Sequence, residues 1–256
     1  MRRMEGRIHS VETMGMADGP GIRYVLFMQG CPLRCQFCHN PDTWHLHDGR
    51  LADSESLFQE AKKFMPYYRA SGGGITVSGG EPLLQAPFVR DLFRACRVAG
   101  IHTALDTTGI IWNDAVEELL QYTDLVLLDL KEMDETKHHE LTGCLNKPVL
   151  QFARYLAEHE IDTWIRHVLV PGLTDHPDSL RQLGAFVSGM KNVQRVELLP
   201  FHKMGEYKWK ELGVTYQLTD VQPPSEQEVQ KAYGYLGEIL PQKLMPGWNR
   251  STACYA

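Results

Sequence analysis

Apolar segments alternate with amphipathic ones about six times along this chain of 256 residues, and this rhythm constrains the fold more than any other feature. Such alternation is typical of βα units whose strands form a parallel sheet. Six units are too few to close an eightfold barrel, so we predict an α/β fold with an open, curved parallel sheet, a partial (β/α)6 barrel. The strands are expected at residues 23–29, 75–78, 101–105, 125–128, 163–170 and 193–199.

Helices are expected between these strands, at about 54–70, 114–122, 148–159 and 179–188, and where Phe88, Val89, Leu92, Phe93 and Cys96 share one face ahead of Gly100. The last helix should begin at Ser225, with Glu228 completing a capping box. The composition forces no division, so residues 1–256 are predicted as one domain. The tail after Pro241 has no periodicity and is expected to be loosely held.

Polar or glycine-rich residues follow the predicted strands. Because the active sites of parallel α/β folds lie at the carboxyl ends of the strands, we treat these residues as candidates for a site. Each has a plainer interpretation: a tight turn, a helix cap or a satisfied polar group. The candidates are Gly79, Gly80, Glu81, Asp106, Thr107, Asp129, Leu130, Lys131, Arg166 and His202.

The first strand leads into a loop, residues 30–40, that holds Cys31, Cys35 and Cys38 in a C-x3-C-x2-C spacing. Three thiolates this close in sequence can converge on one soft metal centre. A four-iron cluster held by three cysteines would keep one iron open to a small molecule.

Three other interpretations of the loop compete. The pattern C-x-x-C-H, ending at His39, also fits c-type haem attachment, but that chemistry needs export and residues 1–6 lead into no apolar segment. A structural zinc ion would use the same cysteines with His39 as fourth ligand. A disulfide is disfavoured in a reducing compartment. Polar groups after all six strands favour a catalytic site over a structural zinc site.

Bulk composition excludes some classes of function. Hydrophobic residues make up 43% of the chain and no apolar run approaches the length that spans a bilayer, so we expect a soluble, cytoplasmic protein. A formal net charge of −6 argues against nucleic acid as the main partner. The dispersed Cys96, Cys144 and Cys254 indicate no second cluster, and the polar surroundings of four histidines predict surface positions for His45, His47, His138 and His139.

The cysteine spacing, with the aromatic Phe37 before the last cysteine, resembles the signature of the radical SAM superfamily, and residues 79–82 resemble its GGEP motif. The run Asp18-Gly19-Pro20-Gly21-Ile22-Arg23, D-G-P-G-x-R, resembles the mark of the glycyl-radical-enzyme activases. This resemblance extends to about residue 239. The cysteine-rich insert that other activases often carry is absent.

The resemblance implies a [4Fe-4S] cluster on Cys31, Cys35 and Cys38, with the fourth iron open to S-adenosyl-L-methionine. It assigns contacts with S-adenosylmethionine to Phe37, Cys38, His39 and the strand-end candidates other than Thr107. It also implies a monovalent cation near Asp106, Thr107, Leu127 and Asp129. The resemblance further implies that the glycine loop of a partner protein is bound by Asp18, Gly19, Pro20, Gly21 and Arg23.

The expected activity is that of a radical SAM oxidoreductase. A reduced cluster cleaves S-adenosylmethionine, and the resulting 5′-deoxyadenosyl radical takes a Cα hydrogen from a glycine of a glycyl-radical enzyme. Flavodoxin or ferredoxin is the expected reductant, and a monomer the expected state. Two alternatives stay open: a radical SAM enzyme acting on a small molecule, and a non-catalytic zinc or iron–sulfur domain. The D-G-P-G-x-R run argues against the first, and the strand-end clusters against the second.

Overall fold

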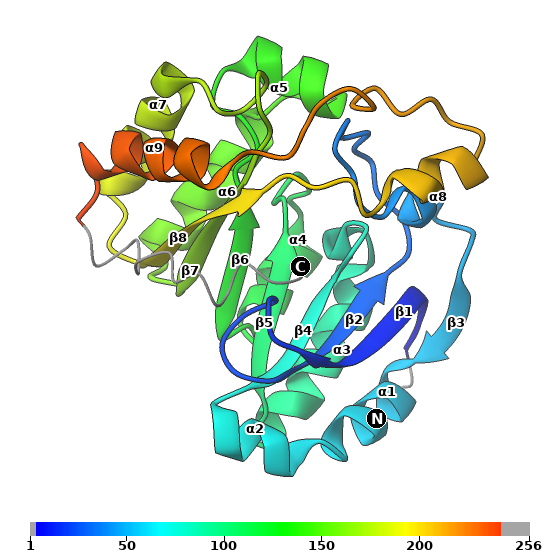
Figure 1. Ribbon diagram of the computed structural model, residues 1–256. Helices are drawn as coiled ribbons and strands as arrows, with labels where there is room; N and C mark the ends of the chain where they lie inside the picture. The colour runs from blue at the N-terminus through cyan, green and yellow to red at the C-terminus, as the bar shows by residue number, and fades with distance from the viewer. Residues whose placement is uncertain (1–3, 242–256) are drawn as a thin grey trace. The chain divides into compact units, whose positions relative to one another are not determined.

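The computed structural model describes residues 4–241 of the chain (Figure 1). Within it the chain forms two compact units. The first comprises the residues up to 32 and residues 43–127, and the second comprises residues 33–42 and those from 128 onward. The boundary at 32/33 lies inside the cysteine segment, so Cys31 belongs to the first unit and Cys35 and Cys38 to the second. That the two units work together as one domain remains a proposal.

The fold is α/β, with a mostly parallel open sheet, as predicted. Among the described residues the strands number eight, in the hydrogen-bonded order β3-β1-β2-β4-β5-β6-β7-β8. The strand β6 is divided between the units after Leu127. The strands are β1 (Glu5–Gly15), β2 (Arg23–Met28), β3 (Arg50–Asp53), β4 (Gly74–Gly79), β5 (His102–Thr107), β6 (Leu125–Asp129), β7 (Thr163–Leu169) and β8 (Val193–Pro200).

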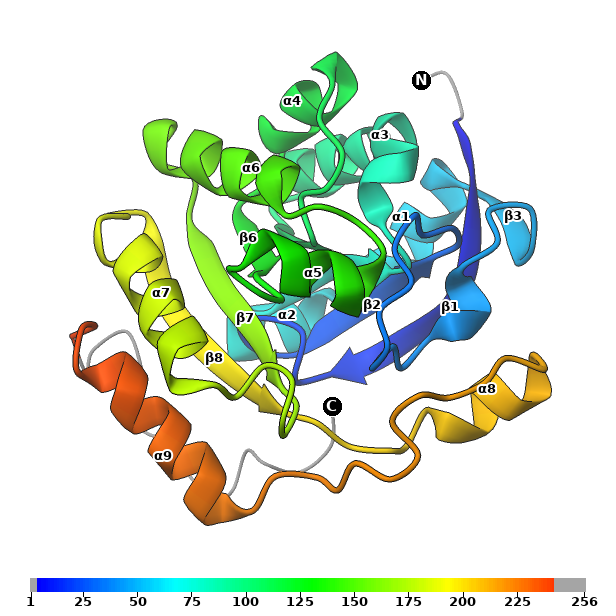
Figure 2. The same cartoon turned by 90° about the horizontal axis from the view of Figure 1, so that it is seen from above.

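In the first unit, β2, β4 and β5 run parallel, and β1 pairs antiparallel with both β2 and β3. Its helices are α1 (Ser54–Lys62), α2 (Met65–Ser71), α3 (Ala86–Val98) and α4 (Asp114–Leu120), with a short 3-10 turn at Pro82–Gln85. A second 3-10 turn, Pro41–Thr43, spans the boundary between the units at 42/43. Helix α3 buries the apolar face predicted for it, including Phe88 and Cys96, and packs against α1 and α4 (Figure 2). Helix α3 also contacts β5, the strand that ends in Asp106 and Thr107.

In the second unit, β7 and β8 run parallel. Its helices are α5 (Glu135–Thr142), α6 (Lys147–Glu158), α7 (Pro177–Ser188), α8 (Glu206–Glu211) and α9 (Glu226–Gly237). Helices α7 and α9 lie side by side, as Figure 2 shows, and Arg181 of α7 pairs with Glu238 just after α9 at 2.7 Å. The predicted capping box is confirmed, because Ser225 and Glu228 bond reciprocally at the start of α9.

Two features of the fold differ from the sequence-based expectation. The strands β1 and β3 were not predicted, because β1 is only partly buried and β3 spans four residues, so neither shows a strong apolar pattern. The expected helix at 54–70 is two helices, α1 and α2, because Pro66 cannot sit in a helix interior and instead occupies the first turn of α2. No helix within residues 4–241 is long and apolar enough to cross a membrane.

Candidate functional site

The turn that follows β4 lies against the residue before Cys31. Gly79 has a φ of 108°, and a Cβ on Gly80 would lie 2.2 Å from the carbonyl oxygen of Gly30. The amide of Glu81 donates to that same carbonyl at 2.7 Å. A side chain at position 80 would prevent this approach. The predicted glycine motif and the start of the cysteine segment therefore lie side by side in the first unit.

Glu81 faces the interior of the first unit and is fully buried. Its Oε1 accepts from the Thr107 hydroxyl at 2.5 Å and the Leu83 amide at 3.1 Å. Its Oε2 accepts from the Thr108 hydroxyl at 2.6 Å and the Thr108 amide at 3.0 Å. Burial raises the pKa of Glu81, and these hydrogen bonds oppose the rise. Its carboxylate thus ties the end of β4 to the end of β5.

Asp106, at the end of β5, is half-buried and accepts a hydrogen bond from the Ser78 hydroxyl at 2.6 Å. Ser78 and Thr108 contact predicted site residues but were not predicted themselves. Their positions in the sequence could have identified them, because Ser78 directly precedes the candidate Gly79 and Thr108 directly follows the candidate Thr107. Asp106 therefore keeps a carboxylate at the carboxyl edge of the sheet, oriented by a neighbouring strand.

The predicted partner-binding turn, residues 18–23, is supported from inside by Arg23, which is fully buried. The Arg23 Nε donates to the Thr76 hydroxyl at 2.9 Å, and its two terminal nitrogens donate to the Pro20 and Ile75 carbonyls. The Thr76 hydroxyl in turn donates to the Asp18 carbonyl at 2.6 Å. Burial lowers the pKa of Arg23 to about 10. The Arg23 side chain shapes the turn and is not part of its exposed surface.

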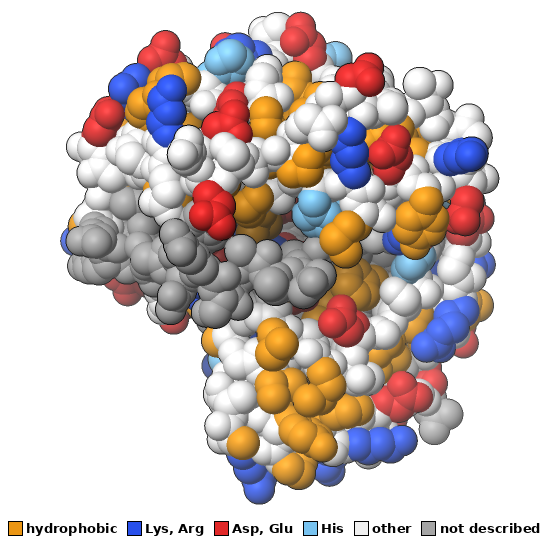
Figure 3. Space-filling view, in the orientation of Figure 1, with side chains coloured by type: hydrophobic (Ala, Val, Ile, Leu, Met, Phe, Trp, Pro, Cys, Tyr) orange, Lys and Arg blue, Asp and Glu red, His pale blue; other side chains and the backbone are white. Residues whose placement is uncertain are grey.

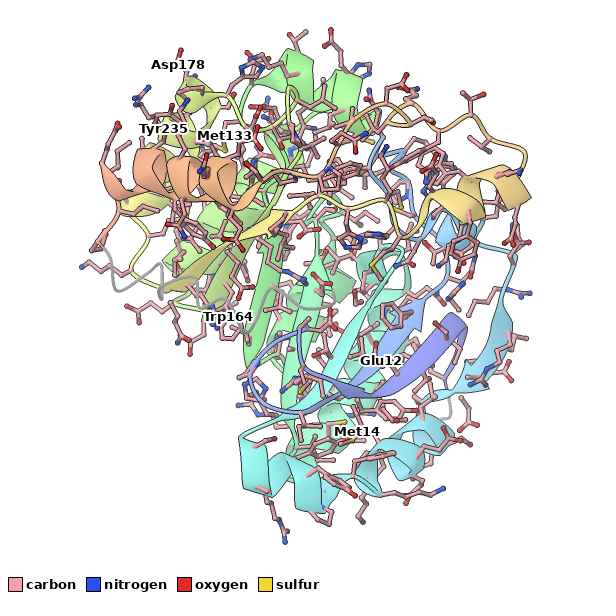
Figure 4. The ribbon with its side chains drawn as sticks, viewed as in Figure 1. Glu12, Met14, Met133, Trp164, Asp178 and Tyr235 are labelled. Carbon is pink, nitrogen blue, oxygen red and sulfur yellow. The ribbon has the colours of Figure 1, made fainter. Side chains whose placement is uncertain are left out.

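Large hydrophobic side chains are exposed just upstream of this turn. Met14 is 45% exposed and Met16 is 81% exposed, and Tyr67 of α2 is also exposed. Figure 3 shows hydrophobic side chains gathered on the surface of the first unit, and Figure 4 places Met14 in the same area. Exposed apolar groups of this kind are frequent at protein–protein contact sites.

In the second unit, the cysteine segment is held by the end of α5. The Arg34 amide donates to the Thr142 carbonyl at 2.7 Å, and the Gln36 amide donates to the Leu141 carbonyl at 3.0 Å. Cys35, between these two anchors, is buried. Its position is therefore set by backbone hydrogen bonds on both sides.

Lys131 brings a buried cation to the cysteines of the second unit. Its ammonium pairs with Asp129 at 2.9 Å and lies 5.2 Å from the centre of the Phe37 ring. Burial raises the pKa of the Cys35 thiol to about 12, and Lys131 acts against that rise. Burial would likewise lower the pKa of Lys131, but Asp129, Cys35 and Cys38 outweigh it and the pKa is raised. Lys131 remains an ammonium that favours nearby thiolates.

His39 and His202 lie together, with ring centres 3.9 Å apart. Burial, assisted by His202 and Lys208, lowers the pKa of His39 to about 4, so this ring is neutral at pH 7. Arg166 is buried, and its carbonyl accepts from the Leu130 amide at 3.0 Å. The second unit thus gathers the predicted residues from the cysteine segment and from the ends of β6, β7 and β8.

The structure corrects one histidine prediction. His138 is 1% exposed, not on the surface, and its Nδ1 lies 2.7 Å from the Cys144 carbonyl oxygen. It faces inward from α5 together with Thr142, whose hydroxyl is within 3.2 Å of the same ring nitrogen. The polar sequence around His138 hid this position because α5 exposes most of its other residues.

Cys31, Cys35 and Cys38 form no disulfide. In the part of the chain that the structure describes, no three His, Cys, Asp or Glu side chains form a group that could hold a metal ion. The donor chemistry nevertheless suits an iron–sulfur cluster, because thiolates are the ligands that such clusters use and the Lys131 cation interacts with Cys35 and Cys38 within the second unit. Cys254 lies outside the described residues.

Sequence reasoning also missed Lys208 and Trp209 of α8. Trp209 donates to the carbonyl of Cys38, and Lys208 binds the side chains of Asn40 and Asp42. No motif contains these two residues, and only the folded chain brings α8 to the cysteine segment.

Comparison with known proteins finds that a profile of the Radical SAM superfamily matches residues 25–183. The chain is 48% identical over 240 residues to the pyruvate formate-lyase-activating enzyme of Staphylococcus epidermidis, covering 91% of this chain and 96% of that protein. It is also 48% identical over 233 residues to the pyruvate formate-lyase 1-activating enzyme of Escherichia coli K12, covering 90% and 95%.

Solved structures agree with this likeness. A domain of a pyruvate-formate lyase-activating enzyme from Bacteroides vulgatus is similar with a TM-score of 0.55 and 30% identity, covering 65% of this chain and 94% of that one. Streptococcus suis SuiB bound to S-adenosylmethionine has a TM-score of 0.65 at 17% identity, covering 88% and 50%. The latter likeness concerns the fold alone.

Proposed function

Because this chain belongs to the radical SAM superfamily and, within it, to the family of pyruvate formate-lyase-activating enzymes, we propose that it activates pyruvate formate-lyase by generating a glycyl radical on that enzyme. The observation that carries the proposal is 48% identity extending over 96% of the length of a relative with that name. The D-G-P-G-x-R run, Trp44 and the segments 129–131, 164–166 and 198–200 also match the pattern expected of this family.

We assign a [4Fe-4S] cluster to Cys31, Cys35 and Cys38, as membership of the superfamily implies. When bound, the cluster supplies the electron for reductive cleavage of S-adenosylmethionine. The chain contributes the charge environment: burial raises the pKa of Cys35, and Lys131 opposes that rise and so favours the thiolate that iron requires.

The S-adenosylmethionine contacts are assigned by role. Gly79 and Gly80 offer backbone close to Cys31, while Glu81 and Thr107, which bond each other, hold that turn in place. The Asp129–Lys131 ion pair and His202 offer polar contacts from the second unit. The other residues assigned to contact S-adenosylmethionine are Phe37, Cys38, His39, Asp106, Leu130 and Arg166. A monovalent cation at Asp106, Thr107, Leu127 and Asp129 completes it, supported by the two carboxylates.

Partner recognition is assigned to the turn at Asp18, Gly19, Pro20 and Gly21, which Arg23 holds from inside. The exposed Met14 and Met16 next to this turn support the assignment, because they offer apolar surface to a protein partner. The proposal includes flavodoxin or ferredoxin as reductant, a monomeric state, and the cytoplasm as location, since reduced thiols are required.

The test is anaerobic reconstitution of the full chain with iron and sulfide, reduction, and addition of S-adenosylmethionine and pyruvate formate-lyase. Electron paramagnetic resonance should show a glycyl-radical doublet on the partner. Cys38→Ser should abolish the doublet, whereas Cys144→Ser, outside the motif, should retain it. A doublet that survives Cys38→Ser would contradict the cluster assignment.

Two other outcomes would redirect the proposal. Release of 5′-deoxyadenosine without the doublet would keep the radical chemistry but reject pyruvate formate-lyase as partner, and other glycyl-radical enzymes or a small molecule would then be tested. A preparation that binds zinc and gives no cluster signal would favour the non-catalytic alternative.

A further inference from the structure

The connection between β8 and α9 folds back onto the segment that follows the third motif cysteine. Trp209, in α8, is 4% exposed, and its indole Nε1 donates to the Cys38 carbonyl at 2.9 Å. The Trp209 ring also packs against Tyr216, with centres 5.1 Å apart. A buried indole is therefore fixed in place on one side and holds the backbone of Cys38 on the other.

A second contact comes from the neighbouring side chain. The Lys208 ammonium lies 2.9 Å from Asn40 Oδ1 and 3.0 Å from Asp42 Oδ2. The Lys208 and Asp42 side chains are 18% and 29% exposed, so this pair is only partly screened by solvent. One ammonium thus joins two side chains that follow Cys38 in the same segment.

A third contact is made by backbone. A Cβ on Gly205 would lie 2.7 Å from the His39 carbonyl oxygen and from its ring carbon Cδ2. The absence of a side chain at this position lets the start of α8 touch His39. Residues 205–216, termed the strap from here on, therefore hold the segment 38–42 by its backbone, its side chains and close packing.

We propose that the strap is a positioning device that keeps Cys38 in place and so slows loss of the iron–sulfur cluster. This inference rests on the proposed function, because it requires that Cys38 binds the cluster. The hydrogen bond from Trp209 reaches Cys38 at its carbonyl oxygen, so the strap acts on this ligand through its backbone. Departure of Cys38 from an iron would require residues 38–42 to move, and each contact opposes that movement. Plain packing of α8 would instead stabilise the whole fold without a specific effect on iron.

Two substitutions isolate the contacts in the full chain. Trp209→Phe removes the N–H donor and keeps an aromatic ring beside Tyr216, and its control is Tyr207→Phe on the exposed face of α8. Lys208→Met removes the ammonium and keeps the aliphatic stem, and its control is Lys210→Met, an exposed lysine of the same helix. Iron release to a chelator is followed anaerobically after reconstitution, and amide hydrogen exchange of residues 35–42 is followed without metal.

Trp209→Phe should accelerate both iron release and local exchange on the order of fivefold, the usual effect of one buried hydrogen bond. Lys208→Met should have a smaller effect, about twofold, because its ion pair is partly exposed. Both controls should behave as wild type, and amide exchange outside the strap and residues 35–42 should stay near wild type in all four variants. This combination separates local positioning from general stability.

If residues 35–42 exchange at the wild-type rate in both Trp209→Phe and Lys208→Met, the positioning role of the strap is rejected, whatever the rate of iron release. Faster exchange with unchanged iron release would overturn its role in retention. Failure of the wild-type chain to take up iron would instead reject the proposed function, because the exchange experiment needs no metal.

Discussion

At the scale of single residues, two charged side chains of the first unit act largely as internal supports, Arg23 at the start of β2 and Glu81 just after the end of β4. Arg23 and Glu81 are both fully buried, and each has hydrogen-bond partners on neighbouring strands or turns. A buried charge is costly unless it is hydrogen-bonded, so the partners of these residues are as important as the residues themselves. This gives two testable expectations.

The first concerns Thr76, whose hydroxyl accepts from Arg23 and donates to the Asp18 carbonyl. Thr76→Val keeps the shape but leaves a buried donor and a carbonyl without this partner. We expect the free energy of unfolding to fall by about 2 kcal/mol in urea titrations. Thr13→Val, at an exposed position of β1, should change it by less than about 0.5 kcal/mol. Equal effects of the two substitutions would show that the Arg23 network contributes no specific stability.

The second concerns pH and Glu81. Burial raises the pKa of Glu81 above its ordinary value of about 4.5, so the folded chain binds this proton more tightly than the unfolded chain. The contribution of Glu81 to stability should therefore be largest below the unfolded pKa and should decline as pH rises through the folded one. The measurement is the unfolding free energy of wild type minus that of Glu81→Gln, followed from below the unfolded pKa of Glu81 to above its folded pKa. Taking the difference cancels the contributions of the other titrating groups. A difference that grows in favour of wild type with rising pH would contradict the sign.

At the scale of elements, the adjacent glycines Gly72 and Gly73, between α2 and β4, are required for different physical reasons. Gly72 ends α2 in the left-handed region, at a φ of 71°, and a Cβ at this position would have no atom within 4 Å. A Cβ on Gly73 would lie 1.9 Å from the Ile22 carbonyl oxygen. The close approach at Gly73 lets the start of β4 pack on the turn that carries Asp18.

We therefore expect Gly72→Ala to cost about 1 kcal/mol of stability, the strain of a left-handed alanine. Gly73→Ala should cost about 3 kcal/mol, because backbone must move to relieve the clash. Urea unfolding of the matched pair measures this difference, and hydrogen exchange should show residues 18–23 loosened only in Gly73→Ala. A Gly72→Ala variant as damaged as Gly73→Ala would mean that conformation, not space, limits this junction.

At the scale of the whole molecule, the parallel sheet could be predicted, because strands buried on both faces leave continuous apolar runs such as Leu125–Leu128. The site at its carboxyl edge stays a prediction. The edge strands β1 and β3 could not be predicted, since partial exposure weakens the pattern. The inward direction of Glu81 and His138 was also hidden, because tertiary packing decides which way a polar side chain faces. The contacts of α8 with residues 38–42 join positions more than 160 apart in sequence and leave no local signal.

Substitution of Asp18 tests whether partner binding and S-adenosylmethionine cleavage depend on different residues. Asp18→Ala removes a carboxylate but keeps the carbonyl that Thr76 binds, so the turn should keep its shape. If the turn grips the partner, cleavage of S-adenosylmethionine without a partner should persist, while glycyl-radical formation should fall about tenfold, the usual effect of losing one charged hydrogen bond. Asp48→Ala, at an exposed loop position of the first unit, should leave both activities unchanged. Parallel measurement of 5′-deoxyadenosine and of the radical signal decides the matter, because equal loss of both activities in Asp18→Ala would place Asp18 in the cleavage step instead of at the partner surface.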